Sequence, residues 1–316
     1  MTGIVYKSTG SWYTVKTDEE VIYKCRMKGK FRIKGIKSTN PIAVGDVVDF
    51  TVEEKNNEET GVIYKIHDRK NYIIRKSVNL SKRIHIIAAN IDQVFLLITL
   101  NNPPTFTSFI DRFLATTEAY NVKTVLLFNK VDAYNQEEIG EIKYLADLYR
   151  SIGYECLGVS ALEGKNVDKV KDMMLDKTSM FVGHSGVGKS TLINTIEEGL
   201  DIKTKEISSQ HSQGQHTTTF AEMFDLSFGA RIIDTPGIKG FGIVDMEKEE
   251  ITDYFPEFFA LKQDCKFNNC LHIEEPHCAV KHALENDKIS YSRYKSYLQM
   301  IEGDDEHYRV DDYKNE

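Results

Sequence analysis

Residues 183–190 read GHSGVGKS, a glycine-rich stretch that ends in a lysine and a serine. The glycines let the backbone curl so that its N–H groups point inward at phosphate oxygens. The lysine adds a positive charge at the β- and γ-phosphates, and the serine hydroxyl is a ligand for Mg²⁺. A strand-like segment, 179–183, precedes the loop, and a helix-like segment, 190–196, begins with its positive dipole end toward the phosphates. This pattern indicates a nucleotide-binding loop, whose expected contacts are Gly183, His184, Ser185, Gly186, Val187, Gly188, Lys189, Ser190 and Thr191.

A second phosphate-side motif, DTPG at 234–237, follows the strand-like residues 230–234 and lies about 50 positions after the loop. Asp234 would hold Mg²⁺ through a water molecule, and the backbone N–H of Gly237 would sense the γ-phosphate. Alone, DTPG is only a turn. At a strand end and downstream of a phosphate loop, it predicts the other half of a Mg²⁺–triphosphate site.

The motif NKVD at 129–132 follows the strand-like residues 123–128 and carries base-recognition chemistry. Asp132 would accept hydrogen bonds from the ring N–H and the exocyclic amine of guanine, which adenine cannot match. Asn129 would brace the loop, and the stem of Lys130 would cover the base.

A fourth motif, SAL at 160–162, follows another strand-like segment. Its expected contacts are Ser160 and Ala161, which would place a backbone N–H toward guanine O6. Ligands of open α/β sheets bind beyond the carboxyl ends of the strands, and each motif lies just after a predicted strand. Together the motifs predict binding of GTP and GDP with Mg²⁺, and they exclude an ATP-dependent kinase.

A chain of 316 residues, 41% hydrophobic and 28% charged, fits a soluble globular protein of two or three domains. Residues 81–245 alternate strand- and helix-like segments, which predicts an α/β domain of the P-loop type with a mostly parallel sheet. Residues 1–80 contain short β-like segments, which predict an all-β barrel, an OB-fold first and an SH3-like barrel as the alternative. Residues 246–316 are acidic and helix-rich and are expected to form a third, small module.

Charge is unevenly distributed along the chain. Residues 1–85 carry 17 Lys and Arg against 10 Asp and Glu, a net +7, so the remaining residues of this −8 chain sum to −15. The basic segment favours a polyanion as partner of the barrel, with a merely solvated basic face as the alternative. Residues 29–38 are a candidate for contacting a phosphate backbone. Trp12 and Phe31 are candidates for stacking on bases, or else members of the barrel core.

The order of the motifs is unusual. Ordinary GTPases run phosphate loop, switch I, DTPG, NKxD and SA, whereas this chain runs NKVD, SAL, phosphate loop, switch I and DTPG. The same cycle cut at another point gives this order, and such a cut is tolerated when the original termini lie close together. The chain therefore resembles the circularly permuted bacterial GTPases of the YjeQ/RsgA family, over nearly its whole length. The resemblance implies an RNA-binding OB-fold, GTP hydrolysis stimulated by the small ribosomal subunit, and a check late in the assembly of that subunit.

Residues 213–219, QGQHTTT, are the candidate switch I. One of its threonine hydroxyls is expected to be the second hydroxyl ligand of Mg²⁺. Thr218 is the favoured residue, and Thr217 and Thr219 are the alternatives.

The group that positions the attacking water is not the usual one. Many GTPases carry a glutamine just after DTxG, but this chain has Ile238, which cannot form hydrogen bonds. His216 resembles the family's catalytic histidine in a G-R-H-T-T pattern, with a surface loop histidine as the alternative. Gln215 stands where the family usually has arginine, so a positive charge is missing at that position.

A metal site is predicted from CKFNNCLHIEEPHC, in which Cys265, Cys270, His272 and Cys278 are spaced as in the same family. Three thiolates and one imidazole make a closed tetrahedral shell, which is typical of structural zinc. Five cysteines in a chain without a leader argue against a disulfide framework. His277 is the alternative fourth ligand, although its position next to Cys278 makes joint ligation awkward. We expect one Zn²⁺ per chain.

Two functions fit these features. The first is a GTP hydrolase that binds the small ribosomal subunit and its rRNA during late assembly, and the Mg²⁺ ligand set with His216 favours it. The second is a GTP-gated regulator of RNA or protein binding whose hydrolysis is incidental.

No apolar run approaches the roughly 18 residues of a membrane span, and the N-terminus lacks the pattern of a signal peptide. We therefore expect a cytoplasmic protein without a membrane partner. We also expect a monomer that does not bind DNA.

Overall fold

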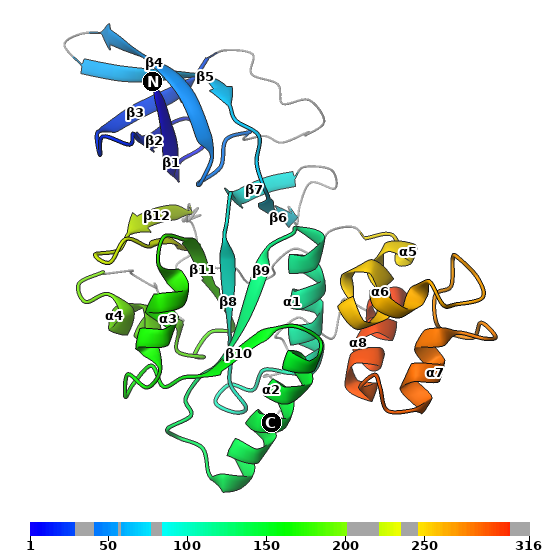
Figure 1. Cartoon of the computed structure of the whole chain (residues 1–316). Coiled ribbons are helices and arrows are strands. Elements are labelled where there is room, and N and C mark those ends of the chain that lie inside the picture. The colour runs from blue at the N-terminus through cyan, green and yellow to red at the C-terminus, as the bar shows by residue number, and fades with distance from the viewer. Residues whose placement is uncertain (29–40, 56–57, 77–83, 201–220, 235–245, 304–316) are drawn as a thin grey trace, which may run out of the picture. The chain divides into compact units, whose positions relative to one another are not determined.

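A computed structural model describes residues 1–28, 41–55, 58–76, 84–200, 221–234 and 246–303 (Figure 1). The chain divides into two compact units. The first takes in 1–95, 161–182 and 188–242, and the second 96–160, 183–187 and 243–316. The division passes through the phosphate loop. The three domains expected at 1–80, 81–245 and 246–316 stay a prediction.

The N-terminal part of the first unit is a closed five-stranded barrel. Its strands are β1 (Thr2–Ser8), β2 (Tyr13–Lys16), β3 (Ile22–Met27), β4 (Val47–Lys55) and β5 (Glu58–Ile66). β2 pairs antiparallel with β1 and β3, β4 pairs antiparallel with β5 and β1, and β3 pairs parallel with β5. The strand order β1-β2-β3-β5-β4, closed by the pairing of β4 with β1 and with β3 parallel to β5, is OB-like and confirms the first expectation for this segment.

Apolar side chains at alternate positions of the strands fill the interior of the barrel. The buried core residues are Val5, Tyr13, Val15, Cys25, Ile42, Val48, Phe50 and Ile63. Gly61 lets the backbone of β5 lie close to the side chain of Cys25 on β3, because a Cβ at position 61 would lie only 2.3 Å from the Sγ atom of Cys25. A short hairpin that the sequence did not predict, β6 (Tyr72–Lys76) with β7 (Ile84–Ala89), follows the barrel. Ala89 donates its backbone N–H to Val44, which ties the hairpin to the barrel.

The first unit also contains the strands that follow the phosphate loop. β11 (Thr178–Val182) is parallel to β13 (Arg231–Asp234), and β12 (Glu222–Asp225) is antiparallel to β13. Helices α3 (Val167–Met174) and α4 (Lys189–Ile196) accompany them. β12 also pairs with the barrel strand β1 at Lys7 and Glu222, where the two side chains form an ion pair of 2.7 Å. Both β12 and α3 are short, and their sequence pattern had not been recognised.

The second unit carries the base-recognition half of the α/β fold. β9 (Lys123–Phe128) is parallel to β10 (Glu155–Gly158) and next to β8 (Gln93–Ile98), of which residues 96–98 belong to this unit and are buried. Helices α1 (Thr107–Ala119) and α2 (Gln136–Ser151) follow β8 and β9, as the alternation predicted. Asn135 starts α2 with a capping box, because its side chain accepts from Glu138 N while Glu138 accepts from Asn135 N.

The C-terminal helices pack against α1 in the same unit (Figure 1). They are α5 (Lys248–Ile251), a 3₁₀ turn (Thr252–Tyr254), α6 (Pro256–Lys262), α7 (Ala279–Glu285) and α8 (Tyr291–Glu302). Phe255, Phe258 and Tyr297 form an aromatic cluster at their centre, with the ring centroids of Phe258 and Tyr297 4.9 Å apart. Among the described residues, no helix is long and apolar enough to cross a membrane.

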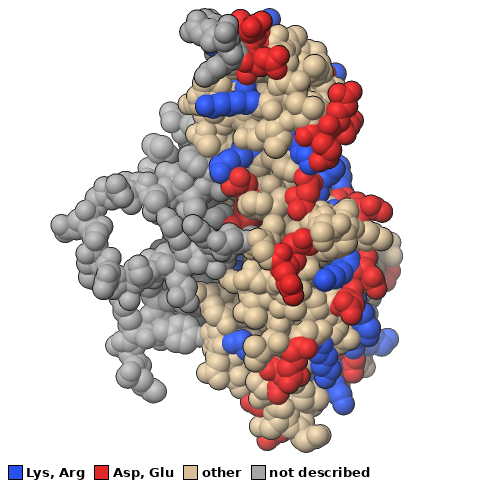
Figure 2. All heavy atoms as spheres, turned by 90° about the vertical axis from the view of Figure 1, so that its left-hand side faces the viewer, with Lys and Arg blue, Asp and Glu red and all other residues tan. Residues whose placement is uncertain are grey.

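Basic and acidic side chains are interspersed on the face drawn in Figure 2. Six of the 17 Lys and Arg residues of positions 1–85 lie in 29–40 and 77–83, outside the described residues, and no Asp or Glu does. The described part of this segment therefore has 11 basic against 10 acidic residues. The net positive charge of the N-terminal segment is thus concentrated in those two short stretches.

Candidate nucleotide site and metal centre

The phosphate loop has backbone angles that only glycine adopts without strain. Gly183, Gly186 and Gly188 have φ angles of +152°, +85° and +96°. A Cβ on Gly183 would lie 2.8 Å from the carbonyl oxygen of Leu97. Helix α4 begins directly after the loop, at Lys189. The local geometry therefore agrees with the strand–loop–helix context that the motif requires.

The base-recognition loop is fastened to the phosphate loop within the second unit. Asn129 is fully buried, and its side-chain Nδ2 donates to the carbonyl oxygen of Val187 at 2.8 Å. Its backbone N–H donates to Ile98 at 2.8 Å. Asn129 thus connects the base-recognition loop to the phosphate loop. Asp132, three positions on, is exposed, which leaves its carboxylate accessible to a ligand.

Sequence reasoning missed the loop that follows β8, residues 99–105. Lys130 donates its ammonium to the carbonyl oxygen of Asn102 at 2.5 Å. The hydroxyl of Thr99 donates to the carbonyl oxygen of Pro103 at 2.6 Å, and a Cβ on Gly186 would lie 3.3 Å from Pro103. The NNPP turn after a buried strand was the available signal, because loops at the carboxyl ends of strands line ligand sites.

The first unit carries Lys189, Ser190 and Thr191 at the start of α4, and Asp234 at the end of β13. Burial lowers the pKa of Lys189 to about 8, and the carboxylate of Asp234 opposes that shift. The hydroxyl of Thr195 on α4 donates to the carbonyl oxygen of Ala161 at 2.9 Å, which connects this helix to the SAL motif.

Several predicted site residues lie outside the described residues. They are Phe31, Gln215, His216, Thr217, Thr218, Thr219, Gly237 and Ile238. The roles expected of them therefore stay predictions. Ser160, in the second unit, is fully buried.

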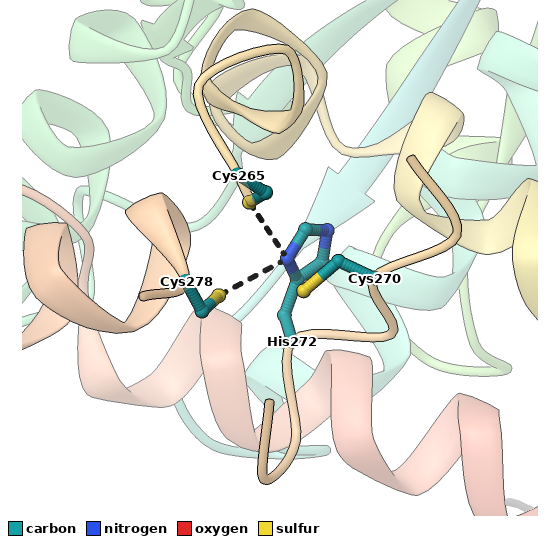
Figure 3. A group of neighbouring side chains, drawn as sticks. All are labelled: Cys265, Cys270, His272 and Cys278. Carbon is teal, nitrogen blue, oxygen red and sulfur yellow. Dashed lines mark hydrogen bonds between the residues drawn. The ribbon is translucent and has the colours of Figure 1, made fainter. Parts of the chain in front are cut away.

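The four predicted metal ligands come together in the C-terminal helices. The ligand atoms of Cys265, Cys270, His272 and Cys278 all lie within 4.8 Å of one another (Figure 3). The Nδ1 atom of His272 is 3.6 Å from Cys265 Sγ and 3.3 Å from Cys278 Sγ. Tetrahedral zinc would separate an imidazole nitrogen and a thiolate sulfur by about 3.5 Å. The donor set and its spacing therefore fit one zinc ion, held by Nδ1 of His272.

Outer contacts orient these ligands. Backbone N–H groups of Ala279 and Lys281 point at Cys265 Sγ and Cys278 Sγ, each at 3.4 Å, where they would stabilise thiolate charge. Tyr294 donates its hydroxyl to the carbonyl oxygen of His272 at 2.6 Å. Burial also lowers the pKa of His272, which favours the neutral imidazole that metals bind.

A buried ion network fixes the C-terminal helices on α1. Arg293 of α8 donates Nη1 to Asp111 of α1 at 2.9 Å, and its Nε and Nη2 to Glu257 of α6 at 2.7 and 3.0 Å. Asp111 also accepts from Ser296 at 2.6 Å and from Tyr149 at 2.8 Å. No sequence pattern pointed to this network, because its members are up to 185 positions apart.

An OB-type barrel, GTPase motifs in permuted order on α/β strands and a Cys₃His cluster together define a circularly permuted GTPase with two accessory parts. Two family models agree: the RsgA N-terminal domain matches residues 2–63, and the RsgA GTPase matches residues 66–244. This chain belongs to the RsgA GTPase family, and it is a GTP hydrolase that binds guanine nucleotides.

The relatives match nearly the whole chain. The small ribosomal subunit biogenesis GTPase RsgA of Christiangramia forsetii is 73% identical over 99% of this chain and 100% of its own length. The protein of the same name from Flavobacterium johnsoniae is 67% identical over 99% of this chain and 96% of its own. Among solved structures, YjeQ from Thermotoga maritima matches with a TM-score of 0.76 at 35% identity, over 96% of this chain and 97% of that one. YloQ, a circularly permuted GTPase, matches with a TM-score of 0.72 at 28% identity, over 100% and 96%.

Proposed function

We propose that this chain binds the small ribosomal subunit and its rRNA and hydrolyses GTP to GDP and phosphate late in the assembly of that subunit. The observation that carries the proposal is the 73% identity, over 99% of the chain, with a protein named a small ribosomal subunit biogenesis GTPase. The barrel is the proposed RNA-binding part. The chain acts as a monomer in the cytoplasm, and one structural Zn²⁺ holds the C-terminal module.

The nucleotide contacts follow from the motifs. The carboxylate of Asp132 reads guanine, the backbone near Ser160 and Ala161 contacts guanine O6, and Asn129 keeps the loop in place. The loop 183–190 surrounds the phosphates with N–H groups, and Lys189 neutralises charge at the β- and γ-phosphates. A Mg²⁺ ion held by Ser190, Thr218 and, through water, Asp234 would neutralise charge on the oxygens of the transferred phosphoryl group.

The attacking water needs a positioning group, and His216 is the proposed one because Ile238 cannot form hydrogen bonds. We expect His216→Ala to keep GTP affinity within about threefold while losing on the order of 100-fold or more of the turnover stimulated by small subunits. Equilibrium binding of a fluorescent GTP analogue and single-turnover phosphate release measure the two quantities. Stimulated turnover within about twofold of the unsubstituted protein would remove His216 from the mechanism.

The function itself is tested by GTP turnover of the unsubstituted protein with and without purified small subunits. Strong stimulation supports an assembly GTPase. Unchanged turnover, together with GTP-dependent capture of another RNA or protein, would instead support the GTP-gated regulator. Purified large subunits at the same concentration are the control for non-specific stimulation by rRNA.

GTP affinity should depend on pH through Lys189. Its lowered pKa of about 8 means that the nucleotide-free lysine is charged below pH 8 and loses its charge above it. Because the phosphates bind the charged form, the dissociation constant should be constant up to about pH 7.5 and then rise, by at most about tenfold per pH unit. Calorimetric titrations at pH 7, 8 and 9 measure the change. Lys189→Arg, whose side chain stays charged, binds less tightly but should lack this rise; an equal rise in both proteins would contradict the assignment.

A further inference from the structure

The barrel carries an open hollow of about 400 Å³ around the only tryptophan of the chain. Its lining residues are Thr9, Trp12, Tyr13, Thr14, Ile22 and Lys24. Trp12 follows the β1–β2 turn, and Ile22 and Lys24 come from β3. A volume of this size is within the range of small-ligand sites.

Trp12 does not belong to the barrel core. Tyr13 is almost fully buried in that core, whereas Trp12 is 39% exposed and Ile22 is 65% exposed. The ammonium of Lys24 lies 4.8 Å from the centre of the indole ring. An exposed indole, an exposed isoleucine and a cation therefore meet at one hollow, and among the residues that the structure describes no carboxylate lines it.

We propose that this hollow is a stacking subsite for one base of single-stranded RNA. A base would displace the ammonium of Lys24 from the indole, stack on the ring and contact Ile22, and the released ammonium would attract the neighbouring phosphate. A lining with a cation and no acid suits a polyanion better than a peptide of mixed charge. Stacking tolerates any base, because every base has a π-face, so the subsite contributes affinity rather than sequence recognition. The inference rests on the proposed function, in which the barrel contacts rRNA, and it names the place of contact.

The single tryptophan makes the subsite directly observable. We would titrate the full-length protein with oligoadenylate and oligouridylate of about ten nucleotides, and with an RNA duplex at the same phosphate concentration. Both single strands should quench the emission of Trp12, and the duplex should not, because its bases remain paired. Fluorescence anisotropy of an end-labelled strand gives the affinity independently of the tryptophan.

Substitutions then separate stacking from other effects. Trp12→Ala should weaken binding of the labelled strand roughly five- to 100-fold, whereas Trp12→Phe, which keeps an aromatic ring, should lose much less. Tyr64→Ala is the matched control, since Tyr64 is an exposed aromatic residue of the same barrel outside the hollow. Trp12 is partly exposed, so its variants should fold, and thermal melting of each variant verifies this.

Three results would overturn the proposal: single strands that bind without changing Trp12 emission, single strands that do not bind at all, and equal affinities of Trp12→Ala and Tyr64→Ala. If only intact subunits, and no oligonucleotide, change the emission, the hollow does not take a base of single-stranded RNA and the proposal also fails. Stimulation of turnover by small subunits in the unsubstituted protein tests the proposed function separately. That stimulation can persist when the stacking subsite is wrong.

Discussion

Replacing Cys265 by serine is expected to abolish zinc binding and to unfold the C-terminal helices. Cys265 is one of four ligands whose atoms lie within 4.8 Å of one another, and both Cys265 and Cys278 are buried in the core of these helices. Structural zinc contributes on the order of 10 kcal/mol to the folding of small domains. Cys265 and Cys278 belong to the small core of these helices, so the helices should not remain ordered without the metal.

Zinc content and helicity measure this effect together. The unsubstituted protein should contain one zinc per chain, and Cys265→Ser close to none, with a loss of far-UV helix signal and rapid proteolysis after residue 246. Cys156→Ser is the matched control, because Cys156 lies on β10 outside the cluster and should keep both zinc and helicity. A zinc-free protein whose C-terminal helices remain folded would contradict the structural role proposed for zinc.

The second large effect is expected at the buried ion network. Arg293→Met should lower the free energy of unfolding by about 3–5 kcal/mol, because it leaves Asp111, which is 0% exposed, without its cation. Glu257 would lose the same partner. The melting temperature should fall by roughly 10 °C, measured by calorimetry or by denaturant unfolding monitored through tyrosine emission.

An exposed arginine–aspartate pair serves as the control for the buried pair of Arg293 and Asp111. Arg150 and Asp147 of α2 form an ion pair of 3.0 Å with side chains 50% and 75% exposed. Arg150→Met should therefore cost at most about 1 kcal/mol. Equal effects of the two substitutions would show that burial does not matter at Asp111.

The effect of Arg293→Met should also depend on pH. Burial raises the pKa of Asp111, and the charge of Arg293 opposes this shift. Without the arginine the folded-state pKa rises further above its unfolded value, so the carboxylate destabilises the fold at pH 7 and this penalty fades as the pH falls. The stability difference between the two proteins should narrow between pH 7 and pH 5. A constant difference over this range would mean that lost packing dominates.

Much of the fold was predictable because its signals are local. The runs DQVFLLIT and KTVLLF coincide with β8 and β9, and the helix predicted after NKVD coincides with α2. The short elements β12, α3 and α7 escaped because four to eight residues show too little periodicity, whereas α4 and β13, which are equally short, were marked by the adjoining phosphate motifs. The β6–β7 hairpin escaped as well, since part of it lies in a stretch without clear alternation.

The chemistry predicted for this protein rests on short motifs. A phosphate loop, a guanine motif and a Cys₃His set are each built from residues close together in the chain, whose types and spacing specify backbone and ligand geometry. The tertiary structure decided which distant residues support them. Asn129 reaches Val187 across 58 positions, Arg293 reaches Asp111 across 182, and Lys24 reaches Trp12 from a neighbouring strand. Such contacts depend on how strands and helices pair, and the order of residues along the chain does not encode that pairing in any local pattern.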